Sequence, residues 1–344
     1  MRLILDAFWL YDGPPSGAAV VRGLLSGWLE RFPDDELVAM VPNSALARAR
    51  EEFPVVQFRG TAIRNHALAV RFALGRLSRS VQAEAVLSQN FTTAGALPAN
   101  VFVHDVLFRS NPEWFTWAER LYLALISRGL RRRPRVFTSS ATEADRIRSF
   151  YPRVEEVVAV GLGPSPSLYT AKSEPPRRIP PEFLLSVGRL NVRKNLGAVV
   201  RAHAELTEAG VELAPLVVVG PAAGLEFDAL GAASGQVSWL GAVSDGELRW
   251  LYEHANGLVF ASLDEGFGLP PVEALAFGCP VLVSDIPVMH EVVGVQGAYF
   301  NPLSSMELKS GLQELSASRR RSPVPPAVWS DIAASIRKAI RVRP

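Results

Sequence analysis

The sequence predicts an α/β protein made of two doubly wound, parallel-sheet domains of the Rossmann-like type. Short β-rich runs alternate with helical patterns about 10 to 20 residues long, which is typical of parallel βαβ units. The alternation stops once, in a proline- and serine-rich stretch at 161–181, and then starts again. The chain has 344 residues, more than one core usually supports. These three observations together favour two tandem domains.

The first half supplies the elements of one sheet. Its predicted strands are 2–8, 36–41, 55–58, 85–88, 101–105 and 135–140, and helical patterns lie between them near 17–31, 44–53, 64–79, 112–133 and 141–150. The second half repeats the alternation, with strands predicted at 183–188, 215–220, 237–241, 257–260, 280–284 and 298–300. We therefore expect an N-terminal domain at 1–165, a linker at 166–181 and a C-terminal domain at 182–326.

Composition excludes several classes of protein. Hydrophobic residues make up 48% and charged residues 20% of the chain, which is the balance of a globular protein and not of a disordered one. The formal net charge of +2 is too small to indicate nucleic-acid binding by itself. The apolar runs are shorter than the roughly 18 residues of a membrane span, and the first residues read as a strand, not as a signal peptide. The single cysteine, Cys279, fits a reducing cytoplasm.

Ligands of doubly wound sheets bind where the strands end, so the residues after strands are the first candidates for a site. The strand 183–188 leads into a loop that opens a helix. This loop carries Gly188, at the end of the strand, and Arg189, Arg193 and Lys194. Glycine lets backbone approach a ligand, and an Arg and a Lys can neutralise a pyrophosphate that a helix N-terminus also favours. A solvated basic turn is the alternative interpretation of this loop.

A second candidate loop follows the strand 257–260 and reads ASLDEGFGLPPVEALAFGCP. Glycines and Phe267 form a turn, two prolines suit the first positions of a helix, and Gly278 ends that helix. Two carboxylates, Glu265 and Glu273, flank this turn. Glu265 in the loop can bind sugar hydroxyls while nearby amides stabilise a departing phosphate. We expect Glu273 in the first helical turn, where an ordinary capping or dipole role is the alternative.

These spaced motifs resemble the retaining GT-B glycosyltransferases of family four, the large group that includes bacterial mannosyltransferases. Glu265 and Glu273 match the E-x7-E motif, and SVGRLNVRKNLGAVVRAHAEL is similar to the loop and helix that bind the donor pyrophosphate. The stretch from VSWLG to HEVVG matches the donor-binding core, and VFVHDVLFRSNPEWF is similar to the His-Asp segment near the transferred sugar. The resemblance covers nearly the whole chain and implies two Rossmann-like domains that face each other across a cleft.

The resemblance also implies a role for each matching residue of the donor site. Arg189 and Lys194 are expected to bind the donor diphosphate after Gly188, and Glu265 and Glu273 to hold sugar and ribose hydroxyls respectively. Backbone amides of the turn would support the diphosphate, and the base would lie near the end of the strand 237–241. The remaining residues of this expected set are Leu240, Gly241, Val243, Gly266, Phe267, Gly268 and Leu269.

For the N-terminal domain, the resemblance implies the acceptor site. His104, at a strand end, is expected to contact the transferred sugar or the reacting face, and Asp105 and Gly17 are expected on the acceptor side. An ordinary strand-end histidine and a structural Asp are the alternatives for the first two. Gly17 lies in DGPPSGAAVVRGLL, which departs from the family's usual glycine-rich loop and leaves the acceptor open.

The reaction implied is the transfer of a hexose from a nucleotide sugar to a hydroxyl with retention of anomeric configuration. The usual proposal for this fold is front-face attack, in which the leaving phosphate takes the acceptor proton, so we expect Glu265, His104, Arg189 and Lys194 to stabilise charge and orient the sugar. We expect no metal and no cofactor, since no DxD-type box follows a strand. GDP-mannose is the expected donor, with UDP-sugars as the alternative.

Two stretches combine basic and apolar residues. They are IRNHALAVRFALGRLSR and EWFTWAERLYLALISRGLRRRPR, and the second places Trp114, Trp117, Leu121 and Leu125 beside an arginine cluster. Such helices can lie on an anionic membrane surface, although core packing with solvated arginines explains the same pattern. The location expected is therefore cytoplasmic, with peripheral contact at the inner membrane face. The last segment, 327–344, reads as a helix, and the resemblance implies that it packs back on the first domain.

Two other kinds of function stay open at this point. A nucleotide-sugar epimerase on a similar scaffold is disfavoured by the paired glutamates with the Arg/Lys loop, and a binding protein that lost catalysis is disfavoured by the presence of Arg189, Lys194, Glu265 and Glu273. A dehydrogenase is disfavoured because no G-x-G-x-x-G follows the first strand. The expected partners are a nucleotide sugar and a saccharide or lipid-linked acceptor, with no nucleic acid.

Overall fold

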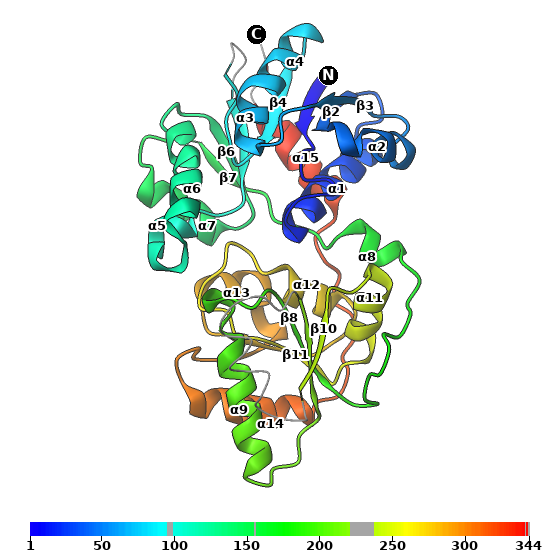
Figure 1. The fold of residues 1–344 in the computed structure, drawn as a ribbon, viewed down its shortest axis with the longest axis vertical. Helices are drawn as coiled ribbons and strands as arrows, with labels where there is room; N and C mark the ends of the chain where they lie inside the picture. Colours follow the sequence, from blue (N-terminus) through cyan, green and yellow to red (C-terminus); the bar gives the residue numbers. More distant parts are fainter. Residues whose placement is uncertain (95–98, 155, 221–236, 341, 343–344) are drawn as a thin grey trace. The chain divides into compact units, whose positions relative to one another are not determined.

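The computed structural model describes residues 1–94, 99–154, 156–220, 237–340 and 342. The chain divides into two compact units, which are considered separately below. Unit 1 contains Met1–Pro166 and Ala327–Pro344, and unit 2 contains Ser167–Pro326. Figure 1 shows a sheet with helices in each unit.

Unit 1 is a sheet of seven parallel strands in the order β3-β2-β1-β4-β5-β6-β7. The order reverses between β1 and β4, which pair directly, so the topological switch point of this sheet lies there. Its elements are β1 (Arg2–Asp6), α1 (Pro15–Arg31), β2 (Glu36–Pro42), η1 (Asn43–Ala45), α2 (Leu46–Glu52), β3 (Gln57–Thr61), α3 (His66–Leu68), η2 (Ala69–Leu74), α4 (Gly75–Ser80), β4 (Ala85–Gln89), β5 (Ala99–Val103), α5 (Leu107–Ser110), η3 (Pro112–Trp114), α6 (Trp117–Leu130), β6 (Arg135–Thr138), α7 (Ala141–Phe150), β7 (Val157–Ala159) and α15 (Trp329–Ala339).

Unit 2 contains a sheet of six parallel strands in the order β10-β9-β8-β11-β12-β13, with its switch point between β8 and β11. Leu184 and Leu185 of β8 belong to different core clusters, so both faces of this sheet are buried. Its elements are α8 (Pro166–Thr170), β8 (Leu184–Val187), η4 (Val192–Lys194), α9 (Leu196–Glu208), β9 (Leu216–Val219), β10 (Val237–Gly241), α11 (Asp245–His254), β11 (Gly257–Phe260), α12 (Leu269–Ala276), β12 (Val281–Ser284), α13 (Pro287–Val292), η5 (Gly294–Gln296), β13 (Ala298–Phe300) and α14 (Ser305–Ser316).

The segment 166–181, for which the sequence predicts a linker, has structure of its own. Its first part forms α8, and Leu168 is buried in the core of unit 2. Arg249 of α11 donates hydrogen bonds to the carbonyls of Tyr169 and Ala171. These contacts attach the segment to unit 2.

The last helix, α15, lies against α1 within unit 1 (Figure 1). Gly23 and Gly27 of α1 make this approach possible, since a Cβ at Gly23 would lie 2.0 Å from the ring of Trp329 and one at Gly27 would lie 2.3 Å from the Trp329 backbone. Trp329 Nε1 donates to the carbonyl of Pro164 at 2.7 Å, and Arg337 pairs with Asp35 at 2.7 Å. Residues from both ends of the chain therefore build one core.

Candidate functional site

The candidate site of unit 2 lies where β8 and β11 end, at the switch point of its sheet. The loop 189–195 follows β8 and the loop 261–268 follows β11. The backbone N–H of Leu263 donates to the carbonyl of Arg193 at 2.8 Å, which ties the two loops together. Doubly wound sheets bind their ligands at this position, so the predicted residues converge where the fold offers a site.

The backbone segments at the ends of β8, β9 and β10 approach each other closely at the same edge of the sheet. Gly188 and Gly220 directly follow β8 and β9, and Gly241 is the last residue of β10. A Cβ at Gly220 would lie 2.0 Å from the carbonyl oxygen of Gly188, so only glycine fits there. The N–H of Gly220 donates to the carbonyl of Gly241 at 2.8 Å. The predicted Gly188 and Gly241 thus belong to one packed edge, where Leu240 and Val243 are partly buried against the core.

A carboxylate with two cations forms the centre of the site. Lys194 Nζ lies 2.5 Å from Oε1 of Glu265, and an Arg193 guanidinium nitrogen lies 2.5 Å from Oε2. The loop is held in shape by Asn191, whose side chain accepts from the N–H of Lys194 at 3.0 Å. Lys194 also extends over the ring of Phe260 at 4.5 Å, a favourable place for an ammonium group. Two positive charges face one negative charge, so the cluster has a net positive charge.

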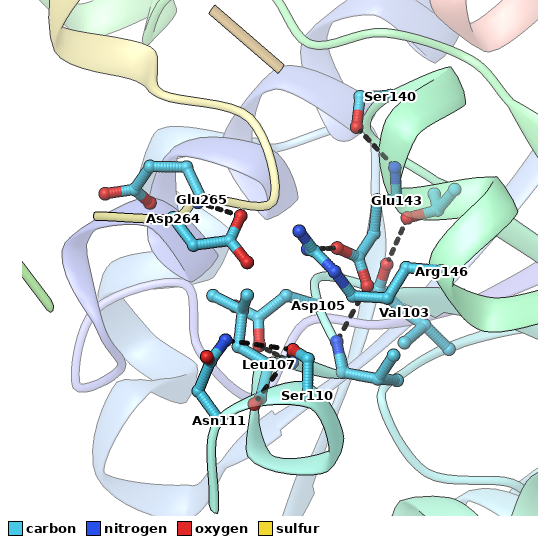
Figure 2. A network of polar contacts seen from close by, with 12 residues as sticks. Val103, Asp105, Leu107, Ser110, Asn111, Ser140, Glu143, Arg146, Asp264 and Glu265 are labelled. Atoms are coloured by element: carbon cyan, nitrogen blue, oxygen red, sulfur yellow. Dashed lines mark hydrogen bonds and ion pairs between the residues drawn. The ribbon is translucent and has the colours of Figure 1, made fainter. Parts of the chain in front are cut away.

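Glu265 is nearly completely buried and still favours its ionised form. Burial opposes ionisation, but Lys194 and Arg193 outweigh it and hold the pKa of Glu265 below its usual value. The backbone N–H of Glu265 donates to Oδ1 of Asp264 at 2.8 Å, a contact drawn in Figure 2. The site therefore contains a fixed carboxylate that can accept hydrogen bonds from ligand hydroxyls.

Glu273 lies elsewhere on α12 than the sequence predicts. The helix begins at Leu269, so Glu273 comes just after its first turn, and the expectation of a first-turn acid was wrong by about one residue. Its Oε2 accepts a hydrogen bond from the buried Tyr252 hydroxyl at 2.9 Å. Burial, followed by the charge of Glu273, raises the pKa of Tyr252 well above its usual value, so the phenol remains a donor. Gly268, with φ +96°, starts the helix in a conformation that favours glycine.

The basic residues of this loop have different surroundings in the structure. Lys194 reaches Glu265, as does Arg193, whereas Arg189 is exposed and has no ion pair within the part of the chain that the structure describes. Gly266 and Leu269 are buried around the turn, and Phe267 is partly buried. Because the sequence alone cannot show which arginine of RLNVRKN turns toward the carboxylate, Arg193 was not among the residues given a donor-site role.

In unit 1, a polar network lies at the switch point between β1 and β4. Oδ2 of Asp6 accepts from the backbone N–H of Gln89 at 3.1 Å and lies 2.7 Å from Nε2 of His66. The Gln89 side-chain oxygen lies 2.8 Å from Nε2 of His104. Asp6, His66 and Gln89 are buried, while His104 is partly exposed. His104 is thus anchored to a buried network and is more than an isolated strand-end histidine.

His66 is a buried member of this network and packs against aromatic rings. It is 4% exposed, pairs with Asp6, and its Nδ1 has no hydrogen-bond partner among the described residues. Trp9 packs on it with ring centroids 4.5 Å apart and on His104 at 5.4 Å. Gly17, expected on the acceptor side, is buried beside Trp9, where a Cβ would lie 2.6 Å from the indole ring.

The buried carboxyl group of Glu143 holds the loop that carries Asp105, as Figure 2 shows. Oε1 of Glu143 accepts from the N–H of Val106 at 2.8 Å, and its other oxygen pairs with Arg146. Burial raises the pKa of Glu143 to about 8, against the opposing effect of Arg146. Oδ1 of Asp105 accepts from the N–H of Leu107 at 3.3 Å, a local turn contact that suits its structural interpretation.

The sequence analysis missed Asp6, Gln89 and Glu143 as site-supporting residues. Asp6 and Gln89 are the last residues of β1 and β4 and lie within two residues of the ends of the predicted strands 2–8 and 85–88, which is the one signal that could have indicated them. Glu143 carries no such signal, since an acid in the first turn of a helix is ordinary. Among the described residues, no group of three or more His, Cys, Asp or Glu side chains is placed to hold a metal ion.

Comparison with known proteins finds a match to a protein family within unit 2. Residues 171–323 match the family described as "Glycosyl transferases group 1", a range that includes Lys194, Glu265 and Glu273. The chain is 46% identical over 80 residues to "O-antigen chain mannosyltransferase RfbU" of Salmonella typhimurium, covering 23% of each protein. It is 28% identical over 282 residues to "MMP alpha-(1->4)-mannosyltransferase" of Mycolicibacterium hassiacum, covering 80% of this chain and 64% of that protein.

Solved structures establish the fold class. Sucrose-phosphate synthase from Thermosynechococcus elongatus superposes with a TM-score of 0.70 at 15% identity, covering 98% of this chain and 94% of that one. The predicted fold class, two parallel-sheet α/β domains of the GT-B type, is thereby confirmed. The alignments with the two curated relatives span less than two thirds of the length of either relative.

Proposed function

We propose that this chain is a retaining glycosyltransferase, which moves mannose from GDP-mannose to a hydroxyl of a saccharide or lipid-linked saccharide in bacterial surface polysaccharide or glycolipid biosynthesis. The observation that carries the proposal is the Arg193, Lys194 and Glu265 cluster, which lies at the switch point of the unit that matches group 1 glycosyltransferases. Relatives named as mannosyltransferases support the choice of sugar.

In this proposal the basic loop binds the donor diphosphate. Lys194 and Arg193 already lie on Glu265, so their side chains are ordered and their charges are partly compensated. A diphosphate at this loop would take over part of those contacts through charge-assisted hydrogen bonds. The exposed Arg189 would supply a further charge, and amides of Gly266 to Leu269 would support the phosphate near the start of α12.

The acids of the site would bind the sugars of the donor. Glu265 remains ionised and can accept from hydroxyls of the transferred hexose, while Glu273, fixed by Tyr252, can accept from the ribose hydroxyls. The base would lie beside Leu240, Gly241 and Val243, where β10 ends. These assignments use groups that meet at one edge of one sheet within unit 2.

The chemistry we propose needs no covalent intermediate with the protein. The acceptor hydroxyl attacks the anomeric carbon from the face that the phosphate leaves, the glycosidic C–O bond to phosphate breaks, and a phosphate oxygen takes the hydroxyl proton. Arg193, Lys194 and the amides of the 266–269 turn stabilise the charge that develops on the leaving diphosphate. Metal-independent transfer is part of the proposal, so addition of EDTA should leave the rate unchanged.

The test is calorimetric titration of the purified protein with GDP, UDP, GDP-mannose and UDP-glucose, followed by transfer assays with the donor that binds. Micromolar binding of guanine nucleotides and an α-linked product from GDP-mannose would support the proposal. Preference for uridine nucleotides would replace the donor with a UDP-sugar, and inversion of the anomeric centre would reject retention. Binding without transfer to any saccharide acceptor would favour an inactive nucleotide-sugar-binding protein.

A substitution at the proposed sugar contact separates binding from transfer. Glu265→Ala removes the fixed acceptor but leaves Arg193 and Lys194 for the diphosphate, so we expect transfer to be lost while GDP still binds. Glu174→Ala, at an exposed carboxylate of the same unit, is the matched control. Transfer by Glu265→Ala at the wild-type rate would contradict the role proposed for Glu265.

We also propose peripheral contact with an anionic membrane through unit 1. Trp117, Leu121 and Leu125 of α6 are 73%, 68% and 42% exposed, so this stripe is not part of the core. Exposed arginines adjoin it, at positions 120, 128, 131, 132 and 133. An amphipathic stripe of this kind suits the interface of an anionic bilayer, where a lipid-linked acceptor would lie. Among the described residues, no helix combines the length and apolar character needed to cross a membrane.

A further inference from the structure

The contact between Gln89 and His104 determines which nitrogen of His104 carries a proton. The Gln89 side-chain oxygen lies 2.8 Å from Nε2 of His104. An amide oxygen can only accept a hydrogen bond, so the ring nitrogen that faces it is the donor. Gln89 is 1% exposed and ends β4, which leaves its side chain little freedom to turn away.

The same contact leaves the second nitrogen as an acceptor. Burial, with a smaller effect of the nearby His66, lowers the pKa of His104 to about 4, so the imidazole is neutral near pH 7 and has a single N–H. With that N–H on Nε2, Nδ1 has a lone pair. His104 is partly exposed, and its Nδ1 makes no hydrogen bond within the described part of the chain. Nδ1 is therefore the atom that is able to receive a ligand hydroxyl.

Asp6 determines the position of Gln89. One oxygen of the buried Asp6 carboxylate accepts from the N–H of Gln89 at 3.1 Å and pairs with His66 at 2.7 Å, and the other accepts from the N–H of Phe8 at 3.2 Å. Three donors around one buried carboxylate fix the end of β4 relative to β1. The backbone of His104 is held as well, since its N–H donates to Oδ1 of Asn90 at 3.0 Å.

Two aromatic rings pack against the imidazole of His104. Trp9 and Phe102 pack on His104 with centroid distances of 5.4 and 5.1 Å. The ring thus has one edge on Gln89, aromatic neighbours at its sides, and its remaining nitrogen available. Asp6 and His66 are the titratable groups that act on His104, with opposite effects on its charge.

We propose that Gln89 and Asp6 are positioning residues that hold His104 in the Nε2–H form, so that Nδ1 accepts a hydrogen bond from a hydroxyl of a bound hexose. The identity of the ligand rests on the proposed function, whereas the tautomer of His104 does not. His104 would then select a ligand that offers a hydroxyl donor at this position, and it would not act as a cationic group.

The first test measures the tautomer directly in the full chain. Imidazole ¹⁵N–¹H correlation spectra at pH 7 distinguish the two neutral forms from the cation, and the His104→Gln spectrum identifies the His104 signals among those of the five histidines. We expect the Nε2–H form at pH 7 and its persistence down to about pH 5. The Nδ1–H form, or an imidazolium at pH 7, would overturn the proposal whether or not the protein transfers a sugar.

The second test changes Gln89 in two ways. Gln89→Leu keeps the approximate size but removes the acceptor, so the two tautomers should both be populated and kcat/KM should fall about 10-fold, the loss of one hydrogen bond. Gln89→Glu keeps an acceptor but adds a charge that raises the pKa of His104, so activity should be low at neutral pH and should recover as the imidazole loses its proton at higher pH. Circular dichroism checks that each variant is folded.

The possible outcomes distinguish the positioning role of Gln89 from the proposed function. A merely structural role for Gln89 predicts equal losses for both variants at every pH, and this would contradict the positioning role. A fixed Nε2–H form in a protein that transfers no sugar would leave the positioning intact and reject the proposed function. Wild-type kcat/KM in both variants, despite an altered tautomer, would show that no hexose hydroxyl bonds to Nδ1.

Discussion

The contact of Glu265 with Arg193 and Lys194 places three charges in a nearly buried setting, where each influences the others. The carboxylate is 7% exposed, and the two cations are 24% and 16% exposed. Removing one of these side chains leaves the charges of the other two incompletely balanced. Ligand binding and the free energy of unfolding should therefore both be measured for each substitution.

Lys194→Ala tests the diphosphate contact. The substitution removes a cation that can form charge-assisted hydrogen bonds worth about 1.5–3 kcal/mol, so we expect GDP to bind roughly 10- to 100-fold more weakly by calorimetry. Lys172→Ala, at an 87% exposed lysine of the same unit, should bind GDP normally. Unchanged affinity in Lys194→Ala would move the phosphate site elsewhere.

Glu143 should make stability depend on pH. Its pKa is about 8 in the folded chain and about 4.5 when unfolded, so the native state holds an extra proton between these values. The contribution of Glu143 is therefore complete below about pH 4.5 and declines as the pH rises through about 8. Glu143→Gln cannot ionise, and the unfolding free energy of the wild type relative to this variant should fall from pH 5 to pH 8 in urea titrations. A difference that stays constant would contradict the raised pKa.

At the scale of single residues, motif and strand position predicted which segments carry the site, but contacts between segments decide which atoms meet. The spacing that marks Glu265 and Lys194 is visible along the chain. Whether Arg189 or Arg193 turns toward Glu265 depends on the short η4 helix and on Asn191, whose cap to Lys194 no spacing rule reveals.

Helix α6 begins later in the structure than the sequence pattern predicts. The pattern predicted one helix at 112–133, but the chain forms η3 at Pro112–Trp114 and begins α6 only at Trp117. The reason is a capping box, in which Thr116 and Glu119 satisfy each other's backbone N–H groups. The same pattern fitted both a core face and a membrane face, and the exposure of Trp117 and Leu121 shows that these two side chains are not in the core.

Replacing the apolar stripe tests its contact with lipid. Trp117→Ser with Leu121→Ser removes two exposed apolar side chains, so we expect binding to vesicles containing phosphatidylglycerol to fall at least about 10-fold in sedimentation assays. The melting temperature should change little because both side chains are exposed. Met306→Ser, which removes a 78% exposed side chain of unit 2, serves as the control. Equal vesicle binding by all three proteins would contradict the membrane proposal.

At the scale of the whole molecule, the two parallel, doubly wound sheets followed from the alternation of strands and helices along the chain. The short elements β7 and α8, of three and five residues, were not predicted as separate elements, because so few residues carry little periodicity. The packing of the last helix on the first domain was expected only from the resemblance, and the structure shows that the pair of glycines on α1 makes room for it.

Gly23→Val tests that contact. A Cβ at Gly23 meets the Trp329 ring at 2.0 Å, so the larger side chain must displace α15 and should lower the unfolding free energy by about 3 kcal/mol. Glu30→Val adds the same side chain to an exposed position of α1 and should cost much less. Denaturant titration followed by tryptophan fluorescence measures both. Equal stability of the two variants would mean that α15 does not depend on the close approach.

The return of α15 to unit 1 also affects the order in which the protein can be made. A ribosome releases residues 167–326 before Trp329 and Arg337 have emerged, so the sheet that is second along the chain can close first. Until then α1 exposes the surface around Gly23 and Gly27 that Trp329 will cover. A nascent chain whose first 326 residues have emerged would accordingly contain a complete unit 2 and a unit 1 that still lacks α15, with an exposed surface of the kind to which chaperones bind.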